Sequence, residues 1–256
     1  MRPCDLRGLG VLVTRPAQQA AGLIQAIRER GGRPHPFPTL ELRPPGDPAR
    51  ARQALAGATR HDLLIFVSAN AVQRAATLAG PGFPPAGAAL AAVGRATARA
   101  LAGLGRPADL VPARADSEGL LALPELQDMH GRSVLIVRGE GGRPLLGEVL
   151  CQRGARVAYA ECYRRALPEA DSGPLLETWE RDIQVVTASS NQVLDNLARL
   201  LGEAGRPRLQ ETPLVSVSGR MARRARDLGI ARLIAAAGPG DAQVVEALCR
   251  WRNPAP

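Results

Sequence analysis

The sequence predicts an α/β fold of two similar lobes, each a parallel sheet flanked by helices, joined by a two-stranded connector. Three observations lead to this prediction. Short apolar, β-branched runs alternate with helical stretches through most of the 256 residues, which is typical of parallel sheets covered by helices on both faces. Short segments also recur in the same order along the chain. Finally, two extended segments interrupt the alternation, as a chain that passes twice between lobes requires.

Six buried strands, each followed by a stretch of helical character, account for most of the chain. The first strand leads into a helix that begins at Pro16 and ends at Gly31-Gly32, because proline favours the first helical turn and glycine the end. The apolar face of this helix carries Ala20, Leu23, Ile24 and Ile27. The predicted strands cover residues 10–13, 62–67, 90–93, 134–137, 183–187 and 214–217.

Four segments recur in order at nearly the same offset. The first, Val11–Arg15 (VLVTR), matches Val134–Arg138 (VLIVR). The other matches pair Arg30–Arg33 with Arg153–Arg156, Ser68-x-Asn70 with Ser189-x-Asn191, and Val93–Arg95 with Ser218–Arg220. Matches of this kind indicate two similar halves rather than a solenoid of many repeats.

Two extended segments set the expected lobe boundaries. Residues 33–48 contain six prolines and therefore cannot form a central strand. Residues 158–168 occupy the equivalent place in the second half of the repeat. We therefore expect lobe 1 over residues 1–36 and 168–256, lobe 2 over residues 46–158, and connector strands over residues 37–45 and 159–167.

The composition excludes several classes of protein. All 33 basic residues are arginine, so a Walker A phosphate loop and a pyridoxal phosphate Schiff base are both excluded. The net charge is +9, but aromatic residues make up only 3% of the chain, which argues against proteins that stack single-stranded bases. No apolar run approaches the roughly 20 residues that span a membrane. We expect a cytoplasmic protein with no membrane segment.

The cysteines and histidines show no metal-binding pattern. Four cysteines and three histidines are dispersed without the spacing of a zinc site, so we expect no metal. Free thiols in a reducing compartment are the expectation for the cysteines, which are Cys4, Cys151, Cys162 and Cys249.

Small, hydroxylated, glycine-bearing or arginine-bearing loops follow the predicted strands. Ligands of open α/β sheets bind beyond the carboxyl ends of strands, where helix amino termini present free N–H groups. Such loops suit anions, although each serine, threonine or asparagine could instead simply cap the following helix. Taken together, the loops favour a polyanionic ligand. The candidate binding residues are Thr14, Arg15, Ser68, Asn70, Gly94, Arg95, Thr97, Arg138, Gly139, Glu140, Ser189, Ser190, Ser218 and Gly219.

Other motifs are incomplete. Gly139-x-Gly141 follows a strand, but Pro144 stands where a dinucleotide-binding motif needs its third glycine. No G-x-S-x-G elbow of a hydrolase is present. The arginines between Arg220 and Arg226 are read as a solvated helix face rather than a phosphate contact.

Several segments resemble the uroporphyrinogen-III synthase family. The likeness extends from about residue 9 to about residue 248, and the order and spacing of the segments make it specific. The segments are Val11–Pro16 (VLVTRP), Phe66–Val72 (FVSANAV), Ala92–Ala98 (AVGRATA), Leu135–Arg143 (LIVRGEGGR) and Glu161–Arg165 (ECYRR).

The resemblance implies an activity without cofactor or metal. It would be the conversion of hydroxymethylbilane, a linear tetrapyrrole, into uroporphyrinogen III, with loss of water, ring closure and inversion of ring D through a spiro intermediate. The fold it implies has two α/β lobes and a cleft. An arginine-rich surface would attract the eight carboxylates of this substrate. As partners we expect this small molecule and a transient contact with porphobilinogen deaminase, with a monomer as the default and no nucleic acid.

The resemblance also implies roles for individual residues. Tyr163 falls on the tyrosine of the second connector segment and would donate a proton to the leaving hydroxyl, since a phenol is ordinarily protonated at neutral pH. The alternative is a tyrosine packed on the connector with its hydroxyl in water. Thr97 and Ser189 match family positions, whereas Gly219-Arg220 lacks the following threonine that the family often has.

Two rival classes remain open at this point. A two-lobed cytosolic protein that binds a small polyanion without catalysis would also have anion-suited loops. A nucleic-acid binder driven by the +9 charge would bind with steep salt dependence. The synthase interpretation accounts for Tyr163, and the rivals do not.

Overall fold

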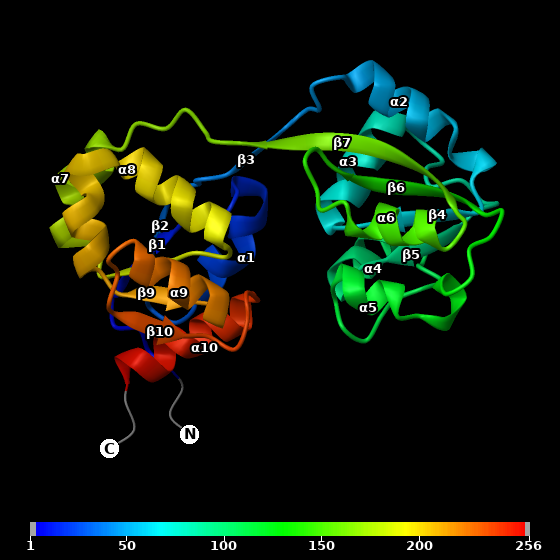
Figure 1. Cartoon of the computed structure of the whole chain (residues 1–256). Helices are drawn as coiled ribbons and strands as arrows, with labels where there is room; N and C mark the ends of the chain where they lie inside the picture. Colours follow the sequence, from blue (N-terminus) through cyan, green and yellow to red (C-terminus); the bar gives the residue numbers. More distant parts are fainter. Residues whose placement is uncertain (1–3, 254–256) are drawn as a thin grey trace. The chain divides into compact units, whose positions relative to one another are not determined.

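A computed structural model describes residues 4–253. The chain forms two compact units, and each is described here by itself. The first comprises Met1–Glu41 and Ala166–Pro256, and the second comprises Leu42–Arg165. Figure 1 labels their helices and strands. The lobe and connector boundaries expected from the sequence stay predictions.

The first unit is a five-stranded sheet in the order β10-β9-β8-β1-β2, and its paired strands are parallel. Its strands are β1 (Gly10–Val13), β2 (Arg33–Pro36), β8 (Val185–Thr187), β9 (Leu214–Ser216) and β10 (Leu233–Ala235). Its helices are α1 (Ala17–Arg28), α7 (Gly173–Asp182), α8 (Asn191–Glu211), α9 (Gly219–Asp227) and α10 (Asp241–Arg252). Inside α8, Gly202 departs from helical geometry and marks a kink.

The second unit contains a five-stranded sheet in the order β3-β7-β6-β4-β5. Its strands are β3 (Glu41–Arg43), β4 (Leu63–Phe66), β5 (Ala89–Ala92), β6 (Ser133–Gly139) and β7 (Arg156–Ala166). Its helices are α2 (Pro48–Ala56), α3 (Ala69–Ala79), α4 (Arg95–Ala102), α5 (Ser117–Leu121) and α6 (Leu145–Gln152), with short 3₁₀ turns at Ala58–Arg60 and Pro124–Leu126.

The repeat found in the sequence corresponds to equivalent places in the two sheets. The matched segments make β1 equivalent to β6, β8 to β4 and β9 to β5. The run β9-β8-β1-β2 of the first sheet thus has the same order as β5-β4-β6-β7 of the second. The prediction of two similar α/β halves with parallel sheets is confirmed.

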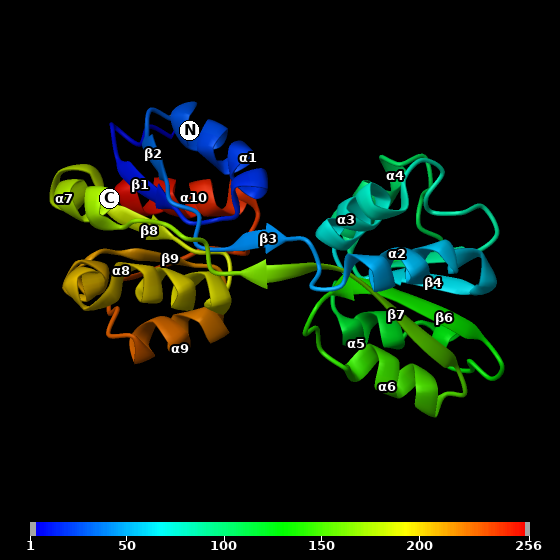
Figure 2. The same ribbon diagram turned by 90° about the horizontal axis from the view of Figure 1, so that it is seen from above.

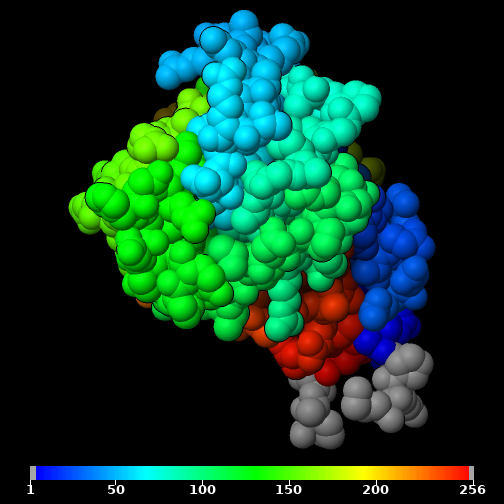
Figure 3. All heavy atoms as spheres, turned by 90° about the vertical axis from the view of Figure 1, so that its right-hand side faces the viewer, coloured from blue at the N-terminus to red at the C-terminus, as the bar shows by residue number. Residues whose placement is uncertain are grey.

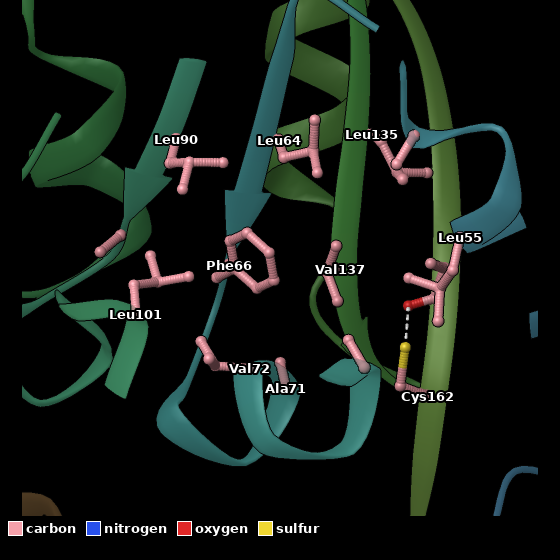
Figure 4. Close-up of a cluster of buried hydrophobic side chains, with 14 of the residues drawn as sticks. Leu55, Leu64, Phe66, Ala71, Val72, Leu90, Leu101, Leu135, Val137 and Cys162 are labelled. Carbon is pink, nitrogen blue, oxygen red and sulfur yellow. Dashed lines mark hydrogen bonds between the residues drawn. The ribbon is translucent and has the colours of Figure 1, made fainter. Parts of the chain in front are cut away.

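Each sheet is covered by helices on both faces because its strands are apolar on both sides. In β1, Leu12 packs with α7, α8 and α9, whereas Val11 and Val13 pack with α1 and α10. Figure 2 shows α1 and α10 on one side of the first sheet and α8 and α9 on the other. In the second unit, Leu64, Phe66, Leu135 and Val137 point into the core drawn in Figure 4, and the alternate residues of β4 and β6 face α5 and α6.

The proline-rich segment begins with an edge strand. β2 lies at the end of the first sheet, and the backbone N–H groups of Arg33 and Phe37 donate to the Leu9 and Val13 carbonyls at 2.8 and 2.9 Å. Pro34 and Pro36 alternate with the donating residues, so their missing N–H groups interrupt no hydrogen bond to β1. The prediction that residues 33–48 form no central strand is confirmed, while β10 was not predicted.

The expectation of four free thiols is wrong. Cys4 and Cys249 form a disulfide, whereas Cys151 and Cys162 are free. The two half-cystines are 245 residues apart in sequence, so no local sequence pattern indicates that they form a disulfide. They meet because α1 and α10 pack together in one core, and the blue and red segments that contain these helices lie side by side in Figure 3.

Candidate active site

The predicted binding residues lie at the ends of strands, or in the loops and first helical turns that follow them, within each unit separately. In the first unit these strands are β1, β8 and β9, and in the second unit they are β4, β5 and β6. At the pairs β1–β8 and β4–β6, the chain connections leave in opposite directions along the sheet. Ligands of open parallel sheets bind outside the carboxyl ends of strands at such switch points. The topology therefore brings the predicted residues to the expected edge of each sheet.

Thr14 follows β1 and is fully buried. Its Oγ1 donates to the Thr187 carbonyl at 2.6 Å, and Thr187 Oγ1 donates to the Leu12 carbonyl at 2.9 Å. This reciprocal pair ties the ends of β1 and β8 together. The Thr14 hydroxyl proton is therefore engaged within the sheet, and the Thr14 carbonyl accepts the Thr39 N–H at 3.1 Å.

Arg15 is also held within the first unit. Its side chain is 11% exposed and forms an ion pair with Asp241, the first residue of α10. Its Nη2 donates to the Pro239 carbonyl at 2.5 Å. The guanidinium thus joins the loop after β1 to the start of α10.

Two helix amino termini stand at the same edge of the first sheet. Ser190 Oγ accepts the Val193 N–H at 3.3 Å, and Ser218 Oγ accepts the Met221 N–H at 3.2 Å. The capping alternative is therefore confirmed for both serines. Ser189 is half-buried and Gly219 is exposed. The remaining N–H groups at the starts of α8 and α9 carry the positive end of each helix dipole, which favours anions.

Tyr163 lies in β7 and is only 1% exposed. Its ring packs against Gly139, where a Cβ would stand 2.7 Å from the ring atoms Cε2 and Cζ. Its hydroxyl lies 3.2 Å from Ser68 Oγ, which also accepts the Ala71 N–H at 3.1 Å and so caps α3. The alternative of a hydroxyl in water does not hold, since the phenol is seated between Gly139 and Ser68.

Arg138 is positioned by two contacts in the second unit. Its Nε and Nη2 donate to Glu161 Oε1 at 3.1 and 2.9 Å. Its guanidinium also stacks over the Tyr159 ring, 4.3 Å from the centroid, in a cation–π arrangement. Both contacts hold the arginine beside Tyr163.

A cavity of about 250 Å³ joins several predicted residues of the second unit. It is lined by Arg138, Gly139, Glu140 and Tyr163 together with residues that sequence reasoning missed. The missed residues include Ser117, Arg143, Tyr159 and Arg165. Tyr159 and Arg165 lie in the same strand as Tyr163 at even spacing, a signal that could have found them.

Other predicted residues of the second unit lie apart from the lining of this cavity. Gly94 precedes α4, and a Cβ there would stand 2.8 Å from Ala115 Cβ. Arg95 is exposed, Thr97 is 5% exposed within α4, and Asn70 is half-buried in the first turn of α3.

Cys162 precedes Tyr163 but does not supply a nucleophile. Its side chain is buried in the core of Figure 4, and burial raises the pKa of the thiol to about 12. The thiol therefore stays protonated near neutral pH.

Comparison with known proteins identifies the family. The family model described as "Uroporphyrinogen-III synthase HemD" matches residues 21–246. The chain belongs to this family. Among curated members of the uroporphyrinogen-III synthase family, the Escherichia coli (strain K12) protein is 35% identical over 230 residues, covering 86% of this chain and 92% of the relative. The Salmonella typhimurium protein matches over the same shares at 35% identity.

Solved structures of the family support the fold. A uroporphyrinogen III synthase mutant from Thermus thermophilus superposes with a TM-score of 0.64 at 19% identity, covering 95% of this chain and 97% of that one. The Helicobacter pylori structure gives 0.57 at 17% identity, covering 82% and 90%. These likenesses confirm the predicted fold class.

Within residues 4–253, no group of three or more His, Cys, Asp or Glu side chains could hold a metal ion. Over the same described range, no helix is long and apolar enough to cross a membrane.

Proposed function

We propose that this protein is a uroporphyrinogen-III synthase, a lyase that converts hydroxymethylbilane into uroporphyrinogen III. The family match over residues 21–246 carries the proposal. The reaction removes the terminal hydroxyl as water and closes the ring with ring D inverted through a spiro intermediate. No redox change occurs, so the reaction needs no electron carrier.

Tyr163 is the proposed proton donor. The hydroxyl leaves as water when it receives a proton, and the ring-closed intermediate later loses a proton, so the phenol can be restored within one turnover. Ser68 Oγ lies 3.2 Å from the phenol oxygen and is half-buried. A proton can therefore pass between the buried phenol and the solvent through the Ser68 hydroxyl. Gly139 supports the proposal because only a residue without a Cβ leaves room for the ring in this position.

Substrate binding is proposed for the carboxyl-end loops. In the second unit, Arg138 and Glu140 line the cavity with Tyr163. In the first unit, the amino termini of α8 and α9 offer N–H groups to substrate carboxylates near Ser190 and Ser218. Because the uncatalysed substrate closes to the wrong isomer, holding it in one folded conformer supplies much of the selectivity.

A coupled isomer assay tests the function. Porphobilinogen and porphobilinogen deaminase are incubated with and without this protein, and the oxidised products are separated into isomers I and III. We expect a shift from isomer I to isomer III. Isomer I alone, from protein shown to be folded, would leave the non-catalytic polyanion binder as the better interpretation.

Replacing Tyr163 tests the proton donor. Tyr163→Phe keeps the ring against Gly139 and removes only the hydroxyl, so we expect isomer III formation to slow about 10- to 100-fold, within the range of general acid catalysis. The melting temperature should change little. Tyr159→Phe is the matched control, since it removes the hydroxyl of the other cavity tyrosine. An unchanged rate in Tyr163→Phe would exclude Tyr163 from the mechanism.

We further propose a cytoplasmic monomer that makes a transient contact with porphobilinogen deaminase. Sedimentation of the protein alone measures its oligomeric state, and sedimentation with the deaminase measures the contact. A stable dimer, or coupled turnover that is independent of the ratio of the two enzymes, would contradict these details.

A further inference from the structure

A second cavity lies in the first unit, at the amino ends of the strands of its sheet. It has a volume of about 510 Å³, within the range of small-molecule sites. Leu9, Gln184, Pro213 and Arg232 line it, and each directly precedes a strand of the sheet. The strands run away from this cavity towards Thr14 and Ser190. The cavity is therefore separated from the proposed catalytic loops by the length of the strands, about 10–13 Å for three or four residues.

The lining of this cavity is rich in positive charge. Arg7, Arg232 and Arg252 line it, with Glu211 as the one carboxylate among the lining residues. Arg232 Nη1 donates to the Glu211 carbonyl at 3.3 Å. Within residues 4–253, the guanidinium groups of Arg7 and Arg252 have no hydrogen-bond or ion-pair partner. Two guanidinium groups at one cavity, neither of them paired with a described residue, are suited to bidentate contacts with an oxyanion.

Arg7 lies in a turn whose backbone is tied to the rest of the unit by hydrogen bonds of its neighbours. Its backbone has φ +49°, a conformation that residues with a side chain rarely adopt. Leu6 and Leu9 on either side are buried, and the Leu9 N–H donates to the Leu6 carbonyl at 3.0 Å. The Gly8 N–H donates to the Gly31 carbonyl at 2.7 Å. Strained backbone that the surroundings hold in this way is concentrated at ligand sites.

The disulfide joins two walls of the same cavity. Cys4 lies three residues before Arg7, and Cys249 lies two residues before Trp251 in the last turns of α10. Trp251 is half-buried and lines the cavity, where its indole gives one apolar wall beside the guanidinium of Arg252. The Cys4–Cys249 bond therefore holds the Arg7 turn and the end of α10 at a set distance.

From these observations we propose that this cavity binds a multivalent oxyanion, a molecule with two or more phosphate or carboxylate groups, and that the Cys4–Cys249 disulfide keeps the site in shape. The proposal is independent of the synthase reaction, because none of its residues lies in the catalytic loops. Phosphate and carboxylate groups share the geometry that arginine recognises. The proposal therefore assigns an oxyanion, and the experiment below distinguishes phosphate from carboxylate.

Calorimetric titration of the oxidised full chain at low ionic strength tests the site. The probes are inorganic pyrophosphate and citrate in separate titrations, and the tighter of the two distinguishes phosphate from carboxylate chemistry. We expect saturable binding of one ligand per chain. Arg7→Ala and Arg252→Gln should each weaken it about tenfold or more. Arg28→Ala, which removes an exposed arginine of α1 outside the cavity, should change it less than about twofold.

A second part of this experiment tests the role of the disulfide. Cys4→Ser/Cys249→Ser, or wild-type protein reduced beforehand, should weaken the binding of the better probe several-fold while the isomer assay is unchanged. Hydrogen exchange locates the effect, with expected ligand protection at residues 5–9 and 250–253. Equal weakening by Arg28→Ala would show general attraction to a basic chain and would overturn the proposal. Absence of binding by both probes would also overturn it, and unchanged affinity in the double serine variant would overturn the role of the disulfide.

Discussion

The two units place an arginine at the same position of the repeat, yet each uses it differently. Arg15 follows β1 and Arg138 is the next-to-last residue of the equivalent strand β6, with side chains 11% and 15% exposed. Each pairs with a carboxylate that is about 40% exposed. The partner of Arg15 is Asp241, at the start of a helix far along the chain, whereas Arg138 pairs with Glu161 in the adjacent strand. A repeated scaffold thus preserves the position of a charge, and the neighbouring elements decide what that charge does.

The strand ends differ in the same way. In the first unit, Thr14 and Thr187 join β1 to β8 by hydroxyl hydrogen bonds. In the second unit, the equivalent positions carry Val137 and Phe66, which pack in an apolar core. Only the second unit places a tyrosine against the loop after its central strand. Equivalent strand ends therefore carry hydroxyl hydrogen bonds in the first unit and apolar packing with Tyr163 in the second.

The largest expected effect comes from filling the space beneath the tyrosine. In Gly139→Ala the new Cβ would stand 2.7 Å from the Tyr163 ring, so the ring has to move. We expect isomer III formation to fall about 100-fold or more, measured by the coupled assay. Gly142→Ala is the matched control, because its Cβ would meet no atom closer than 3.5 Å. A normal rate in Gly139→Ala would show that the position of the Tyr163 ring against Gly139 does not matter for the reaction.

Breaking the two equivalent ion pairs compares the units directly. Arg15→Met and Arg138→Met each leave a half-exposed carboxylate that water can partly solvate, so we expect each to cost about 1–3 kcal/mol in its own unit. Both tryptophans, Trp179 and Trp251, lie in the first unit, so their fluorescence in urea follows that unit, and hydrogen exchange follows the second. Double-mutant cycles with Asp241→Asn and Glu161→Gln provide the control. Equal destabilisation of both units by one variant would contradict the expectation that each ion pair stabilises only its own unit.

Exchanging a hydroxyl for a methyl group makes the first unit resemble the second. Thr14→Val removes the donor to the Thr187 carbonyl at nearly constant volume, and we expect a loss of about 1 kcal/mol in urea unfolding followed by tryptophan fluorescence. Thr14→Ser keeps the donor and is the matched variant. If Thr14→Val is as stable as the wild type, the hydroxyl bonds do not account for the difference between the strand ends.

The smallest expected effect concerns pH. Burial lowers the pKa of His35 in β2 and of His61 before β4 from the ordinary value near 6.5. Below about pH 6.5 the unfolded chain binds a proton that the folded chain resists, so stability falls as the pH falls towards the lowered pKa values. His35→Gln should flatten this decline for the first unit, and His61→Gln for the second. Identical pH profiles in the variants and the wild type would contradict this origin.

The predictability of each part depends on how local its determinants are. Strand β1 and helix α1 could be located because apolar periodicity, Pro16 and Gly31 act over a few residues. Ser190 and Ser218 could be recognised as residues at helix starts for the same reason. The strand β10 could not, because three residues before a glycine-rich loop carry too little pattern.

The sequence by itself determined the α/β class, the repeat, the family resemblance and the edge of each sheet at which polar loops gather, since periodicity and the order of motifs are properties of the chain alone. Only the tertiary structure decided which side chains are already engaged in contacts within the protein. It engaged the Thr14 hydroxyl in the sheet, paired Arg15 with Asp241, seated Tyr163 between Gly139 and Ser68, and joined Cys4 to Cys249. Each of these contacts brings together residues distant in sequence, and packing, rather than any local preference, determines which distant residues meet.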